Sequence, residues 1–517
     1  MKIQQFLDHH GVASNPFAEE DAQTDPVFKE HCIHSTYHPT WDKVYGDPAE
    51  PATSIVFGEK GSGKTALRLQ IVRHLTEFNA KHPNQRVFVI EYDDFNPFLD
   101  RFRDKLPIRR RRLDQVFSQW KLWDHMDAIL SLGVTRLVDR ILAQPAARDT
   151  AQPAAGDTAQ PAAGPRPSDV GPLETALLDR QQARDLLLLA ACYDQSSAET
   201  FRQRWHRLRR KLRFSTWRTK WPLALGAASV AGVFGLIAGL AMSDGAKWNW
   251  LAQPWPYLIA AAGWLPWLAK VWKWYWRAHG VTRQLRVVNH EANPLRQVLM
   301  EFRADEIAGQ PLPNKERTDD RFELLVKLQG VLRTLGFAGV VVLVDRVDEP
   351  HLVNGSPEQM RALLWPMLDN KFLKHPGIGF KLLLPIELSY FIDREDRDFY
   401  QRARLDKQNL VPSLQWTGEA LYDIANARLR ACAANGQAPS LAALFEESVN
   451  DRRLIAALRT LRVPRHMFKF LHRLFVAHAN AHTDDRPAWK ISGETFESVL
   501  TLYQRDQEAY ERGLGVA

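Results

Sequence analysis

A glycine-rich stretch near the amino end holds the residues whose types and spacing are best suited to chemistry. The stretch reads Gly58-Glu59-Lys60-Gly61-Ser62-Gly63-Lys64-Thr65 and fits the pattern GxxxxGK[ST]. Glycines let a backbone wrap around a phosphate with its N–H groups turned inward, a lysine reaches the β- and γ-phosphates, and a threonine hydroxyl binds Mg²⁺. We therefore predict a nucleotide site built by Gly58, Gly61, Ser62, Gly63, Lys64 and Thr65, with Lys64 also acting in catalysis.

A second element is needed to hold the metal, and an apolar run far downstream provides it. Residues 339–344 are apolar and lead into Asp345, a pattern typical of a buried strand followed by a metal-binding carboxylate. At the carboxyl end of such a strand, Asp345 is expected to bind Mg²⁺ together with Thr65. Asp348 and Glu349 follow closely, and either could orient an attacking water. The predicted cofactors are ATP and Mg²⁺, and the alternative for the run is a buried strand with a polar end.

The elements around the glycine-rich stretch indicate how these residues are positioned. Residues 53–57 are apolar and β-branched, which predicts a buried strand; residues 65–78 have helical spacing, and residues 87–92 predict a second strand. Strand, loop, helix and strand open an α/β unit with a parallel sheet. We predict an α/β fold with a parallel, doubly wound sheet flanked by helices, followed by helices from about Thr417.

Two long apolar segments predict a transmembrane helical hairpin. Residues 221–242 carry no charge over 22 residues, enough to span about 30 Å of hydrocarbon. Residues 250–269 are also uncharged but contain three prolines, and tryptophans gather at the ends of both segments, as in an interfacial belt. The alternatives are a pair of buried core helices and, for the second segment, a re-entrant or interfacial helix.

The charges around these segments predict their orientation. Residues 202–220 hold nine Lys or Arg, whereas the connecting loop holds only Lys247, balanced by Asp244. The positive-inside rule places both flanks in the cytoplasm, which predicts a multi-pass protein of an inner or plasma membrane. The flanks can attract anionic membrane lipids, so the formal net charge of +8 does not indicate nucleic acid. Three scattered cysteines fit a reducing compartment.

With these motifs, the chain resembles the AAA+/STAND group of P-loop ATPases, especially origin-recognition-type AAA+ proteins. Its layout is similar to the KAP family, in which transmembrane segments lie between the P-loop and the Walker B strand. Asn15-Pro16-Phe17 resembles the box that covers the adenine, residues 380–385 resemble the sensor 1 strand, and residues 414–416 resemble the fifth strand. The resemblance spans roughly residues 10–100 and 280–480.

The resemblance also implies roles for several arginines. Arg402 and Arg404 lie where an arginine finger is expected, and Arg465, within Val463-Pro464-Arg465-His466, matches the sensor 2 position that reaches the γ-phosphate. Because related ATPases complete their sites with an arginine from a neighbour, the resemblance implies a homo-oligomer. It further implies a nucleotide-driven switch, with a protein partner and a role in bacterial stress or anti-phage defence.

Two departures from the family pattern weaken the expectation of ATP turnover but not that of binding. Arg346 follows Asp345, where many relatives carry the catalytic glutamate, and the sensor 1 strand ends in Pro385-Ile386-Glu387 instead of Asn or Thr. Hydrolysis would then depend on Asp348 or Glu349. The alternative function is a membrane scaffold that hydrolyses ATP weakly or not at all and uses it as a structural ligand.

Six intervals follow as predicted domains. They are an amino-terminal part of the ATPase core (1–100), a helical insertion with a Pro/Ala-rich eight-residue repeat as spacer at 143–170 (101–205), the basic flank and hairpin (206–280), the rest of the core (281–416), a helical lid (417–485) and a tail (486–517).

Two further clusters of polar residues are weaker candidates for binding sites. Cys32, His34 and His38 are too few for a structural zinc site. Lys105 with residues 109–112 indicates a solvated basic helix face more than a binding surface.

Overall fold

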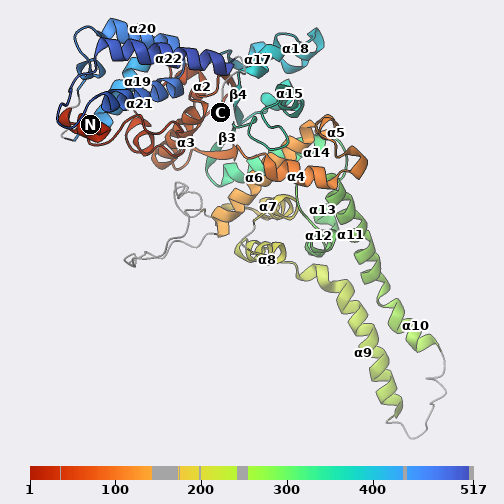
Figure 1. Cartoon of the computed structure of the whole chain (residues 1–517). Helices are drawn as coiled ribbons and strands as arrows, with labels where there is room; N and C mark the ends of the chain where they lie inside the picture. Colours follow the sequence, from red (N-terminus) through yellow and green to blue (C-terminus); the bar gives the residue numbers. More distant parts are fainter. Residues whose placement is uncertain are drawn as a thin grey trace. The chain divides into compact units, whose positions relative to one another are not determined.

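The computed structural model describes residues 1–34, 36–142, 173, 175–196, 199–241, 254–434 and 439–511 (Figure 1). Contacts divide the chain into two units, one formed by Met1–His82 with Val341–Ala517 and the other by Pro83–Val340. The predicted spacer, residues 143–170, and the predicted hairpin loop, residues 243–249, lie outside the described residues.

A five-stranded parallel sheet confirms the predicted α/β fold. Its strands are β1 (Ser54–Gly58), β2 (Arg86–Tyr92), β3 (Phe337–Val344), β4 (Ile378–Pro385) and β5 (Asn409–Val411). They lie in the order β2-β3-β4-β1-β5. Every residue of β1 and of β4 is buried, as expected for strands of a parallel sheet that is covered on both faces.

The register of β1 aligns the ends of two strands that lead to the candidate site. Gly58 pairs with Pro385 of β4, and Val56 pairs with Val411 of β5. The glycine-rich stretch therefore leaves the sheet beside the segment that follows β4. This edge, at the carboxyl ends of the strands, is where open parallel sheets bind ligands.

The fifth strand lies earlier in the sequence than predicted. Residues 414–416 were expected to form it, but β5 is Asn409–Val411 and Pro412 follows at once. Proline has no N–H to donate to a neighbouring strand, so the ladder is interrupted there. The backbone N–H of Leu414 still donates to Phe57 O (2.7 Å), which keeps the following segment beside β1.

Helices of the first unit surround the sheet and continue beyond it. They are α1 (Ile3–His9), α2 (Trp41–Tyr45), α3 (Lys64–Lys81), α15 (Pro357–Leu364), α16 (Asn370–Leu373), α17 (Glu387–Ile392), α18 (Arg397–Ala403), α19 (Gly418–Ala431), α20 (Asp451–Leu461), α21 (Pro464–Ala481) and α22 (Gly493–Glu511).

The helices after β5 share one hydrophobic core with α1. Helix α19 begins where predicted, because the Thr417 hydroxyl accepts from Ala420 N (3.2 Å) as its N-cap. The interval predicted as a tail, 486–517, contains α22, whose Phe496 and Leu500 are buried with Phe6 of α1 and Leu471 of α21. The apolar spacing of α22 makes it part of this helical cluster.

The second unit contains β2, part of β3 and the remaining helices. They are α4 (Asn96–Lys105), α5 (Leu113–Gln119), α6 (Leu122–Leu142), α7 (Arg180–Tyr193), α8 (Phe201–Lys211), α9 (Trp221–Ala241), α10 (Trp255–Ala262), α11 (Leu265–Gln284), α12 (Ala292–Leu299), α13 (Ala304–Ile307) and α14 (Asp319–Thr334). A fully buried ion pair between Asp127 and Arg321 joins α6 to α14.

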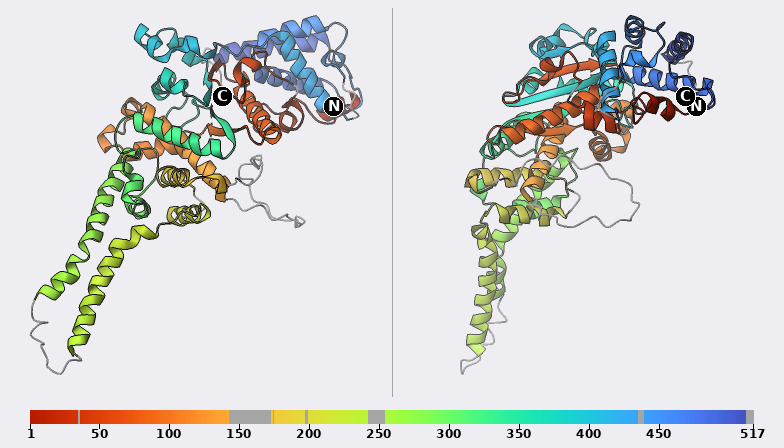
Figure 2. Two further views of the ribbon diagram at one scale, coloured as in Figure 1. Left: turned by 180° about the vertical axis from the view of Figure 1, so that it is seen from behind. Right: turned by 90° about the vertical axis from the view of Figure 1, so that its left-hand side faces the viewer.

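The two apolar segments form helices that lie side by side (Figures 1 and 2). The helices approach closely at two small residues of α9: a Cβ on Gly226 would lie 2.8 Å from the Trp264 ring, and Ser229 Oγ lies 3.3 Å from Ala260 O. The second segment is two helices instead of one, since α10 ends before Gly263 and α11 starts at Leu265. Prolines lie in the first turn of both helices, where their missing N–H costs nothing.

These helices expose an unusual amount of apolar surface. Of the 22 large hydrophobic side chains that are exposed among the described residues, 14 lie between Trp217 and Trp276. By length and composition, one helical stretch of the described chain, Trp217–Gly239, is long and apolar enough to cross a membrane.

Candidate functional site

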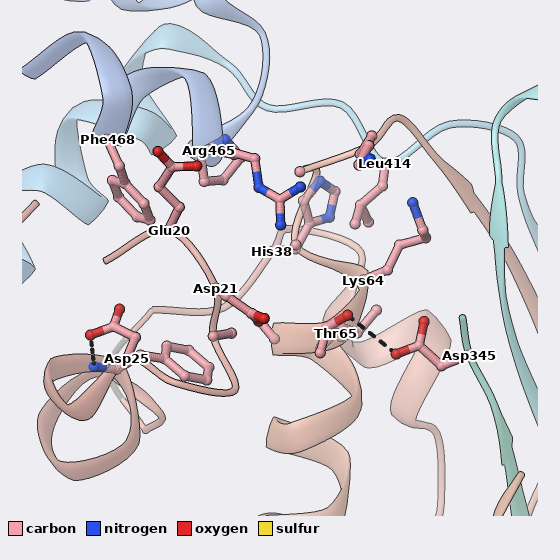
Figure 3. A pocket seen from close by; sticks show the side chains of 18 of the residues that line it. Glu20, Asp21, Asp25, His38, Lys64, Thr65, Asp345, Leu414, Arg465 and Phe468 are labelled. Carbon is pink, nitrogen blue, oxygen red and sulfur yellow. Dashed lines mark hydrogen bonds between the residues drawn. The ribbon is translucent and has the colours of Figure 1, made fainter. Parts of the chain in front are cut away.

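A cavity of about 350 Å³ lies in the first unit, at the carboxyl end of β1 (Figure 3). Its volume falls in the range of small-molecule sites. The glycine-rich loop (residues 58–65) lines it together with Asp345 after β3, Glu387 after β4, and side chains from α19 and α21. Eight of the eleven predicted site residues therefore line one space, whereas Gly58, Ser62 and Arg404 are not part of its described lining.

Three glycines fix the path of the glycine-rich loop. Gly61 and Gly63 have φ angles of +87° and +95°, in the left-handed region that favours glycine. A Cβ on Gly61 would lie 2.5 Å from the Cβ of Arg465, and one on Gly58 would lie 2.4 Å from Ser62 Oγ. At Gly58 and Gly61 the loop therefore has no room for a side chain. The first turn of α3 follows the loop directly.

Lys64 begins α3, and its ammonium group lies against the loop. Its Nζ donates to Gly58 O (2.7 Å) and to Glu59 O (3.0 Å). Burial lowers the pKa of Lys64, while the carboxylates of Asp348, Asp345 and Glu387 act in the opposite direction. The three carboxylates therefore favour the charged form of Lys64 at the loop.

Thr65 and Asp345, the predicted metal ligands, are adjacent. The Thr65 hydroxyl donates to Asp345 Oδ2 (3.3 Å), although 280 residues separate them in the sequence. Asp345 is 2% exposed, and Arg68 Nε of α3 lies 3.3 Å from the same oxygen. Burial raises the pKa of Asp345, and Arg68 opposes this shift. Helix α3 therefore carries both the hydroxyl and the cation that face this carboxylate.

Arg346, directly after Asp345, ties two parts of the cavity wall together. Its backbone is left-handed, with a φ of +59°. Its Nη2 donates to Gln23 Oε1 (2.6 Å), and its Nε lies 3.4 Å from Glu349 Oε1. Burial raises the pKa of Glu349, and Arg346 opposes this shift. Both predicted water-orienting carboxylates, Asp348 and Glu349, line the cavity. Glu349 forms an ion pair with Arg346.

The predicted arginines separate into two groups. Arg465, in the first turn of α21, lines the cavity, and its backbone N–H donates to Gly61 O (3.4 Å). Arg404 does not belong to the described lining: it ends α18 with a φ of +46° and lies 3.5 Å from Asp406. Arg402 instead covers the ring of Phe399, 5.8 Å from its centroid.

Arg428 of α19 is a site residue that sequence reasoning missed. Its Nε donates to Pro16 O (2.6 Å), and its Nη1 donates to Asp25 Oδ2 (2.6 Å) in an ion pair that is almost fully buried. The guanidinium also lies 4.4 Å from the centroid of the Phe468 ring. Arg428 therefore fastens the segment around Asn15-Pro16-Phe17 to the helices beside the cavity. An arginine between the apolar positions Ile424, Ala425 and Leu429 of a helix was the available signal.

The cavity wall contains apolar as well as charged side chains. Ala22, Phe28, Ile424 and Phe468 line it, and the carboxylates of Glu20, Asp21 and Asp25 lie in the same wall (Figure 3). A space with both kinds of side chain suits a molecule that has a flat apolar group and a charged chain.

The cysteine and histidines considered for zinc have other neighbours. His34 lies 3.2 Å from Glu77, His38 contacts Gln415 O (2.8 Å), and Cys32 is buried in the cavity wall. Within the described parts of the chain, no group of three His, Cys, Asp or Glu side chains is arranged to hold a metal ion. A cation bound at Thr65 and Asp345 would need further oxygen ligands from a phosphate chain and water.

Comparisons with known proteins found no match for this chain, whether against protein-family models, curated proteins or solved structures. The resemblance to AAA+/STAND ATPases therefore stays a prediction from the sequence.

Proposed function

We propose that the chain binds Mg-ATP in this cavity and acts as a nucleotide-driven, AAA+/STAND-like P-loop switch anchored in a membrane. The observation that carries the proposal is the meeting of three separate segments: Lys64 and Thr65 after the loop, Asp345 after β3, and Arg465 at the start of α21. These residue types together provide a cation for phosphate, two oxygen ligands for a metal and a second cation.

The polar groups of the cavity fit a nucleotide that carries a divalent cation. The carboxylates of Asp345, Asp348, Glu349 and Glu387 line the cavity with the glycine-rich loop, and they would repel a free phosphate chain. Mg²⁺ supplies the charge that offsets this repulsion, and Thr65 and Asp345 would hold it.

The apolar side chains of the cavity wall, Phe28, Ile424 and Phe468, favour adenine as the base. The resemblance assigns the Asn15-Pro16-Phe17 segment to the cover of the adenine, and Arg428 holds that segment beside Phe468. The same resemblance favours a homo-oligomer in which Arg404 or Arg402 serves the site of a neighbouring copy.

The alternative, a scaffold that binds ATP without turning it over, is favoured by one specific observation. By the resemblance, Arg346 occupies the place of the catalytic glutamate, and its Nε lies 3.4 Å from Glu349 Oε1. Any turnover would then depend on Asp348 or Glu349.

Binding and turnover are tested with detergent-solubilised protein. We expect Mg-ATP to bind by calorimetry, and Lys64→Ala to weaken binding by roughly ten- to a hundredfold, the range for a hydrogen bond to a charged group. Lys81→Ala, an exposed lysine at the other end of α3, is the matched control and should bind as the wild type does. Phosphate release that is lost in Glu349→Gln makes the chain an ATPase with Glu349 as base. Tight binding without release favours the scaffold, and absence of binding refutes the proposal.

The membrane anchor is proposed to be α9 with α10 and α11. The exposed apolar side chains between Trp217 and Trp276 support it, and the basic flanks favour a cytoplasmic nucleotide site. In intact cells, a maleimide that cannot cross membranes should label Lys247→Cys but not Arg218→Cys. The native Cys32, Cys192 and Cys432 are buried and give little background. Equal labelling of both variants would contradict the predicted hairpin.

A further inference from the structure

Trp416 joins the glycine-rich loop to the start of the helical cluster. It stands directly before Thr417, the N-cap of α19, and its indole Nε1 donates to Ser62 O (2.8 Å). A Cβ on Gly63 would lie 3.7 Å from the same ring. The side chain therefore binds Ser62 from a position 354 residues further along the chain, and its ring lies beside Gly63.

The hydrogen bond to Ser62 O determines how one peptide unit is turned. In a trans peptide the C=O of Ser62 and the N–H of Gly63 point in opposite directions. An indole that holds the carbonyl on one side therefore turns the Gly63 N–H to the other side. Gly63 lines the cavity together with Lys64 and Thr65, and backbone N–H groups at such a helix start are the donors that bind phosphate.

His38 fixes the indole in turn. The Thr40 backbone N–H donates to His38 Nδ1 (3.1 Å), so Nδ1 is an acceptor and Nε2 carries the proton that is donated to Gln415 O (2.8 Å). Burial lowers the pKa of His38, which agrees with a neutral ring. Its ring meets that of Trp416 edge-on, with centroids 4.6 Å apart and an interplanar angle of 90°. The backbone before Trp416 and the ring itself are thus both held.

We propose that Trp416 is a positioning residue for the phosphate chain: its N–H orients the Ser62–Gly63 peptide so that Gly63 N–H faces the phosphates. The inference rests on the proposed nucleotide site. A residue that only fills space would act through its ring, which is half-buried against the helical cluster, and would affect every ligand alike. An orienting hydrogen bond affects only ligands that carry phosphate.

The test compares Mg-ATP, Mg-pyrophosphate and adenosine by calorimetry. Trp416→Phe keeps an aromatic ring and removes the N–H, so we expect it to weaken ATP and pyrophosphate by the same factor, roughly two- to tenfold, and to leave adenosine unchanged. Trp416→His keeps a ring N–H and should restore part of the loss. Trp489→Phe, a half-exposed tryptophan stacked on His9, is the matched control and should change none of the three affinities.

A second measurement uses the wild-type chain labelled with 5-fluorotryptophan. The ¹⁹F resonance of Trp416, assigned with whichever Trp416 variant folds, should shift on addition of Mg-pyrophosphate and stay in place with adenosine. Equal weakening of all three ligands, or a resonance that ignores pyrophosphate, overturns the inference. If the wild type binds no Mg-ATP, the proposed function itself fails; if it binds and the Trp416 variants match it, only this inference fails.

Discussion

Gly61→Ala probes the close approach between the glycine-rich loop and the first turn of α21. The substitution forces a residue with a Cβ into a φ of +87°, which costs roughly 1–2 kcal/mol. The new Cβ also lies 2.5 Å from the Cβ of Arg465, an atom fixed to the backbone of the first turn of α21, so the helix must move. Such overpacking costs typically about 1–3 kcal/mol. Together, we expect a loss of about 2–5 kcal/mol in the free energy of unfolding.

The two parts of this loss can be separated. Gly309 has a φ of +73° and nothing within 4 Å of the position of a Cβ, so Gly309→Ala measures the backbone part alone, about 1–2 kcal/mol. Arg465→Gly removes the opposing Cβ, so in that background Gly61→Ala should cost about 1–3 kcal/mol less than in the wild type. Urea unfolding of the solubilised protein, followed by circular dichroism, gives the four values of the cycle. Strict additivity of Gly61→Ala and Arg465→Gly would show that the close approach stores no energy and refute the reasoning.

Three further changes test other contacts. Arg428→Met leaves the buried Asp25 without its cation and should lower the free energy of unfolding by roughly 3–5 kcal/mol; a melting temperature equal to that of the wild type would contradict this. Burial lowers the pKa of Lys381 from 10.5 to about 8, so between these pH values the unfolded chain binds more protons. Stability should therefore rise with pH across this window, and Lys381→Met should remove that rise in a series of melting curves. Gly226→Leu should separate the two arms of the hairpin by pushing against an indole of the opposite arm, whereas Gly232→Leu, with nothing within 4 Å, should not. The yield of a disulfide engineered between the arms measures this difference.

Local signals explain how much of the fold could be predicted. The strand before Gly58 and the strand before Asp345 are continuous apolar runs with a clear end, and both formed where expected. The meeting of Thr65 with Asp345 also followed, because the carboxyl ends of parallel strands share one edge of a sheet. These inferences needed only patterns within a few residues and one rule of topology.

The contacts that were missed depend on partners far apart in the sequence. No spacing relates Trp416 to Ser62 or Arg428 to Asp25, which are 354 and 403 residues apart. The fifth strand was misplaced because a three-residue strand carries almost no pattern, and Pro412 lies between it and the apolar residues that had suggested it. The break between α10 and α11 was signalled by prolines, but an apolar composition alone did not fix where the helices end.

The order of the segments in the chain has a consequence for biosynthesis. The whole second unit, Pro83–Val340, is translated between Thr65 and Asp345, so these two residues can meet only after 280 further residues have left the ribosome. At about 5–20 residues per second this takes roughly 15–55 s. During that interval β1 has emerged without β4 and β5, its neighbours on both sides, and its edges are open to wrong pairing. The proposed nucleotide would therefore bind only to chains whose intervening helices have already been made, so its binding would stabilise finished molecules and not nascent ones.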